Sequence, residues 1–146
     1  MPNQMAALRA CGFIVFRRLK QNIEFLLLQT SYGDHHWTPP KGHVDPGEND
    51  LDTAFRETEE EAGLKPDRLN VVDGFCHELR YTVRDRPKTT VYWLAELSTP
   101  ETQVTLSHEH QDWCWLEVEK ACRLVRYPDM QGALRDATAF LSAGTH

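Results

Sequence analysis

The stretch Gly42–Leu64 reads GHVDPGENDLDTAFRETEEEAGL and carries the strongest helix signal in the chain. Asn49 or Asp50 can cap the start of a helix over Asn49–Ala62, and Gly63 stands where a left-handed C-terminal cap is common. Apolar positions recur with a 3.6-residue period and predict a buried stripe, formed by Leu51, Ala54, Phe55, Thr58 and Ala62. The segment therefore predicts a capped helix with one face in the core.

Three glutamates fall to one side of this stripe. At about 100° per residue, Glu57 and Glu61 lie one turn apart, and Glu60 lies beside them. Such a group is typical of a solvated acidic helix face. It is equally typical of hard oxygen ligands for Mg²⁺ or Mn²⁺. The charge pattern alone leaves both interpretations open.

The flanking sequence predicts strands before and after this helix and two helices at the end. Branched and aromatic runs predict strands over Cys11–Phe16, Ile23–Gln29, Leu69–Val83, Thr89–Leu97 and Gln111–Leu116, with a turn at Arg84–Lys88. Amphipathic patterns predict helices over Glu117–Val125 and Asp129–Leu141. The loop His35–Gly47 is rich in turn residues and precedes the central helix, a usual place for ligand contacts. We expect an α+β fold, an α/β/α sandwich, in one domain spanning residues 1–146.

Composition limits the class of protein. The 146 residues are 40% hydrophobic and 26% charged, as in ordinary soluble domains. The sequence contains no run of about 18 apolar residues, so no membrane span is expected. Met1–Cys11 lacks the apolar length of a secretory signal. We therefore expect a cytoplasmic monomer, with the nucleus left open as a second location. The net charge of −6 argues against a general nucleic-acid binder.

Neither the cysteines nor the tryptophans predict a site. Four cysteines without a CxxC pair are expected to be reduced: Cys11, Cys76, Cys114 and Cys122. The tryptophans sit among apolar residues and are expected in the core: Trp37, Trp93, Trp113 and Trp115.

The spacing around the glutamates matches a known signature. Gly42, Glu48 and the run Arg56–Leu64 resemble the box of the Nudix hydrolases, Gx5Ex7REUxEExGU, where U is a bulky aliphatic residue. Eight of the nine defined positions agree, and the departure is Thr58 at an aliphatic position. Because Thr58 lies on the predicted buried stripe, the change affects packing more than the glutamates.

The resemblance extends over almost the whole chain. The segments HHWTPPKGH at His35–His43 and LSHEH at Leu106–His110, with the region of Lys88, are similar to the animal asymmetrical diadenosine tetraphosphate hydrolases. This resemblance implies a Nudix fold, with a mixed sheet between helices. It also implies a small-molecule dinucleoside polyphosphate substrate, cleaved by divalent-metal-assisted attack of water to give ATP and AMP. Mg²⁺ is the expected ion, with Mn²⁺ or another divalent cation as the alternative.

The resemblance also assigns roles around the metal. Glu57 and Glu61 match the main metal ligands, and Glu60 matches a further one. Glu109 matches an extra glutamate that either binds a second metal or takes a proton from water, and its alternative is a solvated loop carboxylate. Arg56 is expected to orient a glutamate through a bidentate pair. Glu48 is expected to have a structural role where the loop meets the helix.

Substrate contacts are assigned in the same way. His36, Lys41 and Lys88 match phosphate-contacting positions, although a single lysine is more often a surface residue. His43 is expected to contact either a phosphate or the loop backbone. A second group supplies aromatic rings: Tyr81 and Tyr127 match an adenine clamp, and Tyr32 is expected near the phosphates. Stacking suits bases, but a core role for the tyrosines remains the alternative.

Three functions fit the sequence. The first is hydrolysis of a dinucleoside tetraphosphate. The second is another Nudix reaction, on a nucleoside diphosphate sugar, a cap structure or a modified nucleotide. The third is an inert domain that binds nucleotide or RNA. Inert members usually lose box glutamates, whereas Glu57, Glu60 and Glu61 are all present here.

Overall fold

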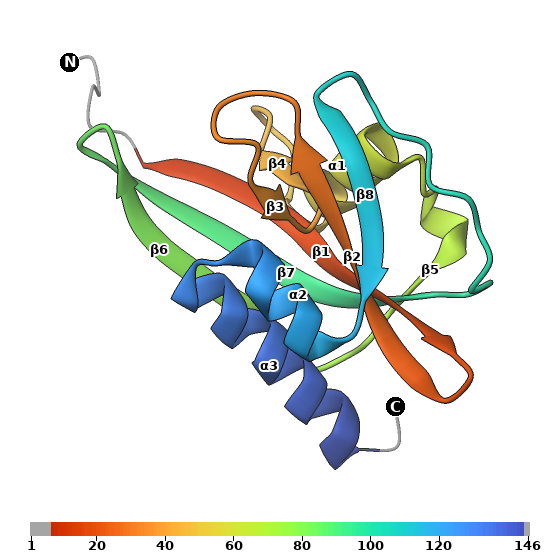
Figure 1. Ribbon diagram of the computed structural model, residues 1–146. Coiled ribbons are helices and arrows are strands. Elements are labelled where there is room, and N and C mark those ends of the chain that lie inside the picture. Colours follow the sequence, from red (N-terminus) through yellow and green to blue (C-terminus); the bar gives the residue numbers. More distant parts are fainter. Residues whose placement is uncertain (1–6, 145–146) are drawn as a thin grey trace.

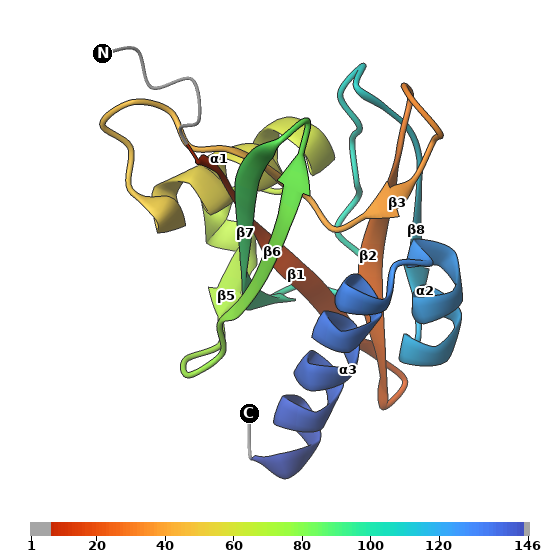
Figure 2. The ribbon, with the colours of Figure 1, turned by 90° about the vertical axis from the view of Figure 1, so that its left-hand side faces the viewer.

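A mixed sheet lies between helices in the computed structural model, which describes residues 7–144. Figure 2 shows α1 on one side of the sheet and the pair α2 and α3 on the other. The helices are α1 (Asp50–Ala62), α2 (Val118–Val125) and α3 (Pro128–Ala143), with a short 3-10 turn, η1 (Pro66–Arg68). The strands are β1 (Leu8–Leu19), β2 (Asn22–Thr30), β3 (Trp37–Thr38), β4 (Lys41–His43), β5 (Leu69–Val71), β6 (His77–Val83), β7 (Arg86–Leu97) and β8 (His110–Leu116). The predicted α+β sandwich is confirmed.

The sheet is built around a parallel pair, β1 and β7, at its centre (Figure 1). The strand order is β3-β2-β1-β7-β5, and β4, β6 and β8 pair with β1, β7 and β2 in turn. All pairings other than β1 with β7 are antiparallel. Within residues 7–144, no helix is both long and apolar enough to cross a bilayer.

Strand alternation divides the core into two clusters, one on each face. In β1, Ile14 and Phe16 face α2 and α3, whereas Phe13 and Val15 face α1. Successive strand residues point to opposite faces, so continuous apolar runs are expected in strands buried on both sides. The two clusters fix α1 against one face and the C-terminal helices against the other.

Helix α1 begins and ends as its sequence predicts. The Asn49 side chain accepts a hydrogen bond from the Asp52 N–H at 2.8 Å, so Asn49 is the cap. Gly63 adopts φ 71° and closes the helix by donating to the Glu59 carbonyl. One position of the predicted stripe is wrong: Leu51 is 38% exposed. It lies in the first turn, ahead of the part of the helix that packs on the sheet.

The strand predicted over Leu69–Val83 is two strands, β5 and β6. The chain breaks at Gly74, whose φ of 92° only glycine adopts readily, and the Phe140 ring of α3 packs 3.3 Å from where a Cβ would stand. The predicted turn Arg84–Lys88 is also too long. Arg84 and Asp85 both take positive φ and close a two-residue hairpin, so β7 already begins at Arg86.

Two further expectations need correction. The segment His35–Gly47 is not wholly a loop, because it contains the short strands β3 and β4, which pair with β2 and β1. Trp113 is 37% exposed and lies outside the core, since β8 pairs only along β2 in the described sheet. The other three tryptophans are partly buried and pack against the core clusters or pockets.

Candidate active site

Two glutamates of α1 lie against the backbone of β4. Glu61 is only 8% exposed, and its Oε1 accepts a hydrogen bond from the Lys41 N–H at 3.1 Å. Glu57 reaches Gly42, where an added Cβ would stand 2.1 Å from the Glu57 carboxyl carbon. Gly42 is therefore required because the carboxylate occupies the space of a side chain. The helical spacing that predicted a Glu57–Glu61 pair is reproduced in the geometry.

Burial makes this pair electrostatically unfavourable without a cation. Burial and the neighbouring Glu57 raise the pKa of Glu61 to about 8. Burial also raises the pKa of Glu57, although Arg56 opposes the shift. A positive ion beside the two carboxylates would restore their charged forms, because an opposite charge nearby favours ionisation.

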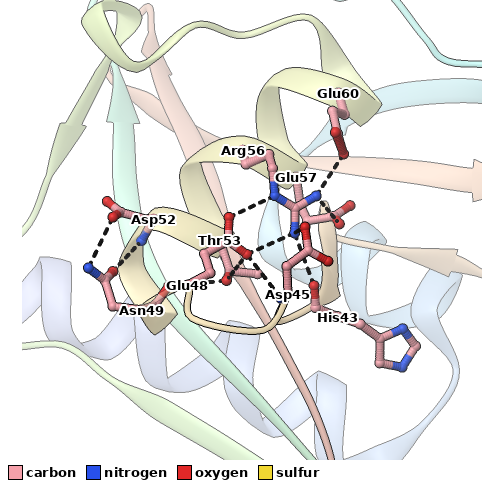
Figure 3. A network of polar contacts seen from close by, with 9 residues as sticks. All are labelled: His43, Asp45, Glu48, Asn49, Asp52, Thr53, Arg56, Glu57 and Glu60. Atoms are coloured by element: carbon pink, nitrogen blue, oxygen red, sulfur yellow. Dashed lines mark hydrogen bonds and ion pairs between the residues drawn. The ribbon is translucent and has the colours of Figure 1, made fainter.

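Arg56 joins the start of α1 to the loop before it (Figure 3). Its Nε and Nη2 donate to the two oxygens of Glu48 at 2.8 and 3.0 Å, and its Nη1 donates to Glu57 at 2.9 Å. Arg56 also donates to the His43 carbonyl at 3.0 Å. These bonds hold the pKa of Glu48 down at about 2, chiefly through Arg56. The bidentate partner is thus Glu48, through which Arg56 fixes the loop-to-helix junction.

The two remaining predicted ligands lie in different places. Glu60 is exposed, and its Oε1 accepts from Arg56 at 3.0 Å, on the edge of the Glu57–Glu61 pair. Glu109, in the loop before β8, lines the same pocket as Glu57 and Glu61. Across residues 7–144, no three acidic, histidine or cysteine side chains converge closely enough to form a complete metal site. The structure brings Glu109 into the pocket, whereas Glu60 is exposed to solvent and does not line it.

We call the hollow above these groups the carboxylate pocket, with a volume of about 220 Å³. Its functional lining comprises Tyr32, Lys41, His43, Glu57, Glu61, Glu109 and His110. Burial, Lys88 and Lys41 lower the pKa of His43. Burial and Lys41 lower the pKa of Lys88. Lys41, Lys88 and His43 lie close enough for their charges to interact, and this concentration of positive charge favours an anionic ligand, although Lys88 itself does not line the carboxylate pocket.

A second hollow, the tyrosine pocket, adjoins the first and has a volume of about 430 Å³. It is lined by His36, Trp37, Thr38, Lys41, Leu79, Tyr81, Tyr92, Tyr127, Asp129 and Met130. Thr38 and Lys41 line both pockets and so connect them. The predicted partners Tyr81 and Tyr127 are 42% and 55% exposed, which excludes the core role.

The hydroxyl of Tyr81 lies 3.2 Å from Thr90 Oγ1, and Lys88 Nζ lies 5.9 Å from the Tyr81 ring centroid. One hairpin, β6–β7, therefore presents a ring and an ammonium group together. His36 stands in the tyrosine pocket, whereas Tyr32 lies in the carboxylate pocket, with the two rings edge to face at 6.4 Å. Such a surface can stack a base while cations meet attached phosphates.

Two residues of the site were missed by sequence reasoning. His110 is buried beside Glu61, with Nε2 4.0 Å from Glu61 Oε1, and its Nδ1 has no hydrogen-bond partner. Its only signal was its position next to Glu109. Asp34 accepts a hydrogen bond from His36, which lowers the pKa of Asp34. Nothing local in the sequence marks Asp34.

Comparisons with known proteins agree with this geometry. The NUDIX domain model matches residues 7–138. The chain is similar to the asymmetrical bis(5'-nucleosyl)-tetraphosphatases of Mus musculus and Caenorhabditis elegans, with 52% and 50% identity over 92% of this chain and 96% of each relative. The crystal structure of a C. elegans Ap4A hydrolase binary complex superposes with a TM-score of 0.91 at 47% identity, covering 94% of this chain and 99% of that one. The chain belongs to the Nudix family.

Proposed function

We propose that this protein hydrolyses dinucleoside polyphosphates, converting diadenosine tetraphosphate and water to ATP and AMP. The proposal rests on two pockets that share Lys41 in their lining. One pocket contains the glutamates of α1, and the other contains two exposed tyrosines. A substrate with a base and a polyphosphate chain matches both chemistries. The relatives named bis(5'-nucleosyl)-tetraphosphatase share about half of their residues with this chain over nearly its full length.

Nudix hydrolases use divalent metal ions, and the residues here suit one. Glu57 and Glu61 offer hard oxygen ligands, and burial, with the charge of the neighbouring glutamates, raises the pKa of both. Mg²⁺ commonly takes one or two carboxylates and completes its shell with water and substrate phosphate. We assign Mg²⁺ to this pair, with Glu60 of the same helix as a further ligand. When bound, the ion neutralises phosphate charge and makes water more nucleophilic.

The protein's own groups position the substrate. Lys41 and Lys88 meet the negative charge of the phosphate chain, with His36 and His43 beside them. Tyr81 and Tyr127 stack against one adenine and leave the other nucleotide on the side of Tyr32. Glu109 lines the carboxylate pocket from a separate wall, where its carboxylate serves either as a further metal ligand or as the base that accepts the proton of the attacking water.

Product identity tests the function directly. Purified protein is incubated with Mg²⁺ and a panel of dinucleoside polyphosphates, nucleoside diphosphate sugars and capped nucleotides, and products are separated by chromatography. ATP and AMP from the tetraphosphate are expected, and hydrolysis in ¹⁸O-water should label one product at a single site. Two ADP would contradict asymmetric cleavage, and cleavage of another panel member alone would assign a different Nudix reaction.

The metal assignment has its own test. Glu57→Gln and Glu61→Gln should each abolish most turnover at saturating Mg²⁺ with the fold intact, because the charge that anchors the ion is lost. Glu59→Gln, on an exposed position of the same helix, is the matched control and should keep its activity. Near-normal turnover in either test variant would contradict the assignment. A monomeric state and a cytoplasmic location remain predictions, to be checked by light scattering and by fractionation.

A further inference from the structure

One exposed carboxylate, Asp34, contacts two residues that line the tyrosine pocket, His36 and Tyr127. Its Oδ1 accepts from His36 Nδ1 at 3.1 Å, and its Oδ2 accepts from the Tyr127 hydroxyl at 3.4 Å. Arg126 Nη2 stands 3.9 Å from the same Oδ2. Asp34 belongs to the β2–β3 loop, whereas Arg126 and Tyr127 form the α2–α3 connection. A single side chain therefore links segments that are 93 residues apart.

The α2–α3 connection is strained at this point. Arg126 has φ 67° and ψ −38°, and the Tyr127 N–H donates to the Val125 carbonyl at 2.7 Å. This is a γ-turn with positive φ, a conformation that is rare and disfavoured for a residue with a side chain. Tyr127 lines the tyrosine pocket with 55% of its surface exposed. Its hydroxyl contact with Asp34 is therefore one restraint on where the ring lies.

The β2–β3 loop keeps its shape through other bonds. The Thr30 N–H donates to the His36 carbonyl at 3.0 Å, and the His35 N–H donates to the Tyr32 carbonyl at 3.2 Å. The Ser31 hydroxyl donates to the His108 carbonyl at 3.0 Å. None of these uses the Asp34 carboxylate. Its removal should release His36 and Tyr127 without unfolding the loop.

We infer that Asp34 is a positioning residue that holds His36 and Tyr127 in fixed relation across the mouth of the tyrosine pocket, before the substrate arrives. The inference rests on the proposed function, in which these two side chains meet phosphate and base. Without the link, binding must order both side chains at once, which weakens affinity. Neither side chain borders the carboxylate pair, so the loss falls on KM rather than on kcat.

Kinetics of single and double variants test this role. Asp34→Ala and Tyr127→Phe should each raise KM for diadenosine tetraphosphate about two- to tenfold, the net effect of one hydrogen bond, with kcat within about twofold. The double variant should be no worse than Asp34→Ala, because both remove the same contact. Asp34→Asn keeps an acceptor oxygen and should recover part of the loss. Asp136→Ala removes a comparable pair with His77, at 3.0 Å and outside both substrate pockets, and should leave KM unchanged.

Two outcomes would overturn the inference. Additive losses in the double variant would show that Asp34 and Tyr127 act separately. A fall in kcat or melting temperature with unchanged KM would show a different role for Asp34. Calorimetric titration with AMP, which needs no turnover, separates this inference from the proposed function. If the wild type fails to cleave the tetraphosphate, the function fails, while weaker AMP binding by Asp34→Ala still supports the positioning role.

Discussion

At the scale of single residues, the buried carboxylate of Glu61 lowers the stability of the fold when it is ionised. Its pKa rises from 4.5 in the unfolded chain to about 8 in the fold, so the folded state holds a proton that the unfolded state releases between these values. Stability is therefore lost as pH rises from about 4.5 to 8. Glu61→Gln should stabilise the metal-free protein at pH 8.5 on the order of 2 kcal/mol, because one pKa unit corresponds to about 1.4 kcal/mol and local relaxation recovers part. Near pH 5 the gain should be small.

Melting temperatures from pH 5 to 8.5 in the presence of a chelator measure this effect. Glu59→Gln changes an exposed carboxylate that lies about 200° around the helix from Glu57 and Glu61, and it should show no gain that grows with pH. A gain for Glu61→Gln that is equal at every pH would refute the explanation by burial of charge. Added Mg²⁺ should stabilise the wild type and have little effect on Glu61→Gln.

Tyr81 carries a second prediction at this scale. Tyr81→Ala should lower kcat/KM by about ten- to a hundredfold, because stacking on one base contributes about 1–3 kcal/mol. Tyr81→Phe should lose little, since the ring survives and only the contact with Thr90 disappears. Steady-state kinetics on both variants decide the point. Equal damage by the two substitutions would show that the hydroxyl matters and the stacking account is wrong.

Residue-scale prediction from sequence succeeds where neighbours are close along the chain. Glu57 and Glu61 are one helical turn apart, so their pairing follows from geometry. A bidentate pair of Arg56 with a glutamate was predicted, but not which glutamate. The partner is Glu48, which the conformation of the loop before α1 places beside Arg56. Asp34 was missed because its partner Tyr127 stands 93 residues away. Burial of His110 depends in the same way on β8 pairing with β2.

At the scale of elements, α1 contains a matched pair of buried threonines. Thr58 Oγ1 has no hydrogen-bond partner, whereas the Thr53 hydroxyl donates to Glu48 at 2.6 Å. Thr58→Val should stabilise the protein by about 1 kcal/mol, because a buried unsatisfied hydroxyl is replaced by a methyl group. Thr53→Val should destabilise it by about 1–3 kcal/mol, because Glu48 loses a buried partner. Chemical denaturation of both variants would test the opposite signs, and a loss of stability in both would contradict the account.

The same helix explains what sequence can predict about elements. Its cap at Asn49 and its end at Gly63 are local signals, and both are confirmed. The turn after β6 was predicted in the right place but three residues too long, because Arg84 and Asp85 adopt positive φ without the glycine or asparagine that usually indicates a two-residue turn. The break at Gly74 has a local signal in the glycine itself, whose φ is 92°, whereas the packing of Phe140 from α3 against it is a tertiary contact that no local pattern carries.

At the scale of the whole molecule, the fold fixes the separation between the carboxylates of α1 and the tyrosine pocket. Figure 2 shows α1, which carries the carboxylates, on one face of the sheet and α3 on the other. Tyr127 is the N-cap residue of α3. The strands β3 and β4 pass between them, and Lys41 borders both pockets. Its N–H also donates to Glu61, which ties this connection to the carboxylate pair. If the substrate fills both pockets as proposed, its phosphate chain is held in one position relative to the carboxylates.

A fixed register predicts the products from substrates of different length. If the adenine clamp and the carboxylate pair keep a constant separation, the cleaved bond lies a constant number of phosphates from the clamped base. Diadenosine tri-, tetra- and pentaphosphate should then share one product, while the other product lengthens by one phosphate at each step. Chromatography of the three digests measures this, with ¹⁸O-water locating the attacked phosphorus in each. Tyr81→Ala should give a mixture of cleavage sites as well as slow the reaction, because the clamped adenine fixes where the phosphate chain begins. If the three substrates have no product in common, the groups around the metal alone choose the bond that is cleaved. The tyrosine pocket would then contribute affinity without fixing the site of cleavage.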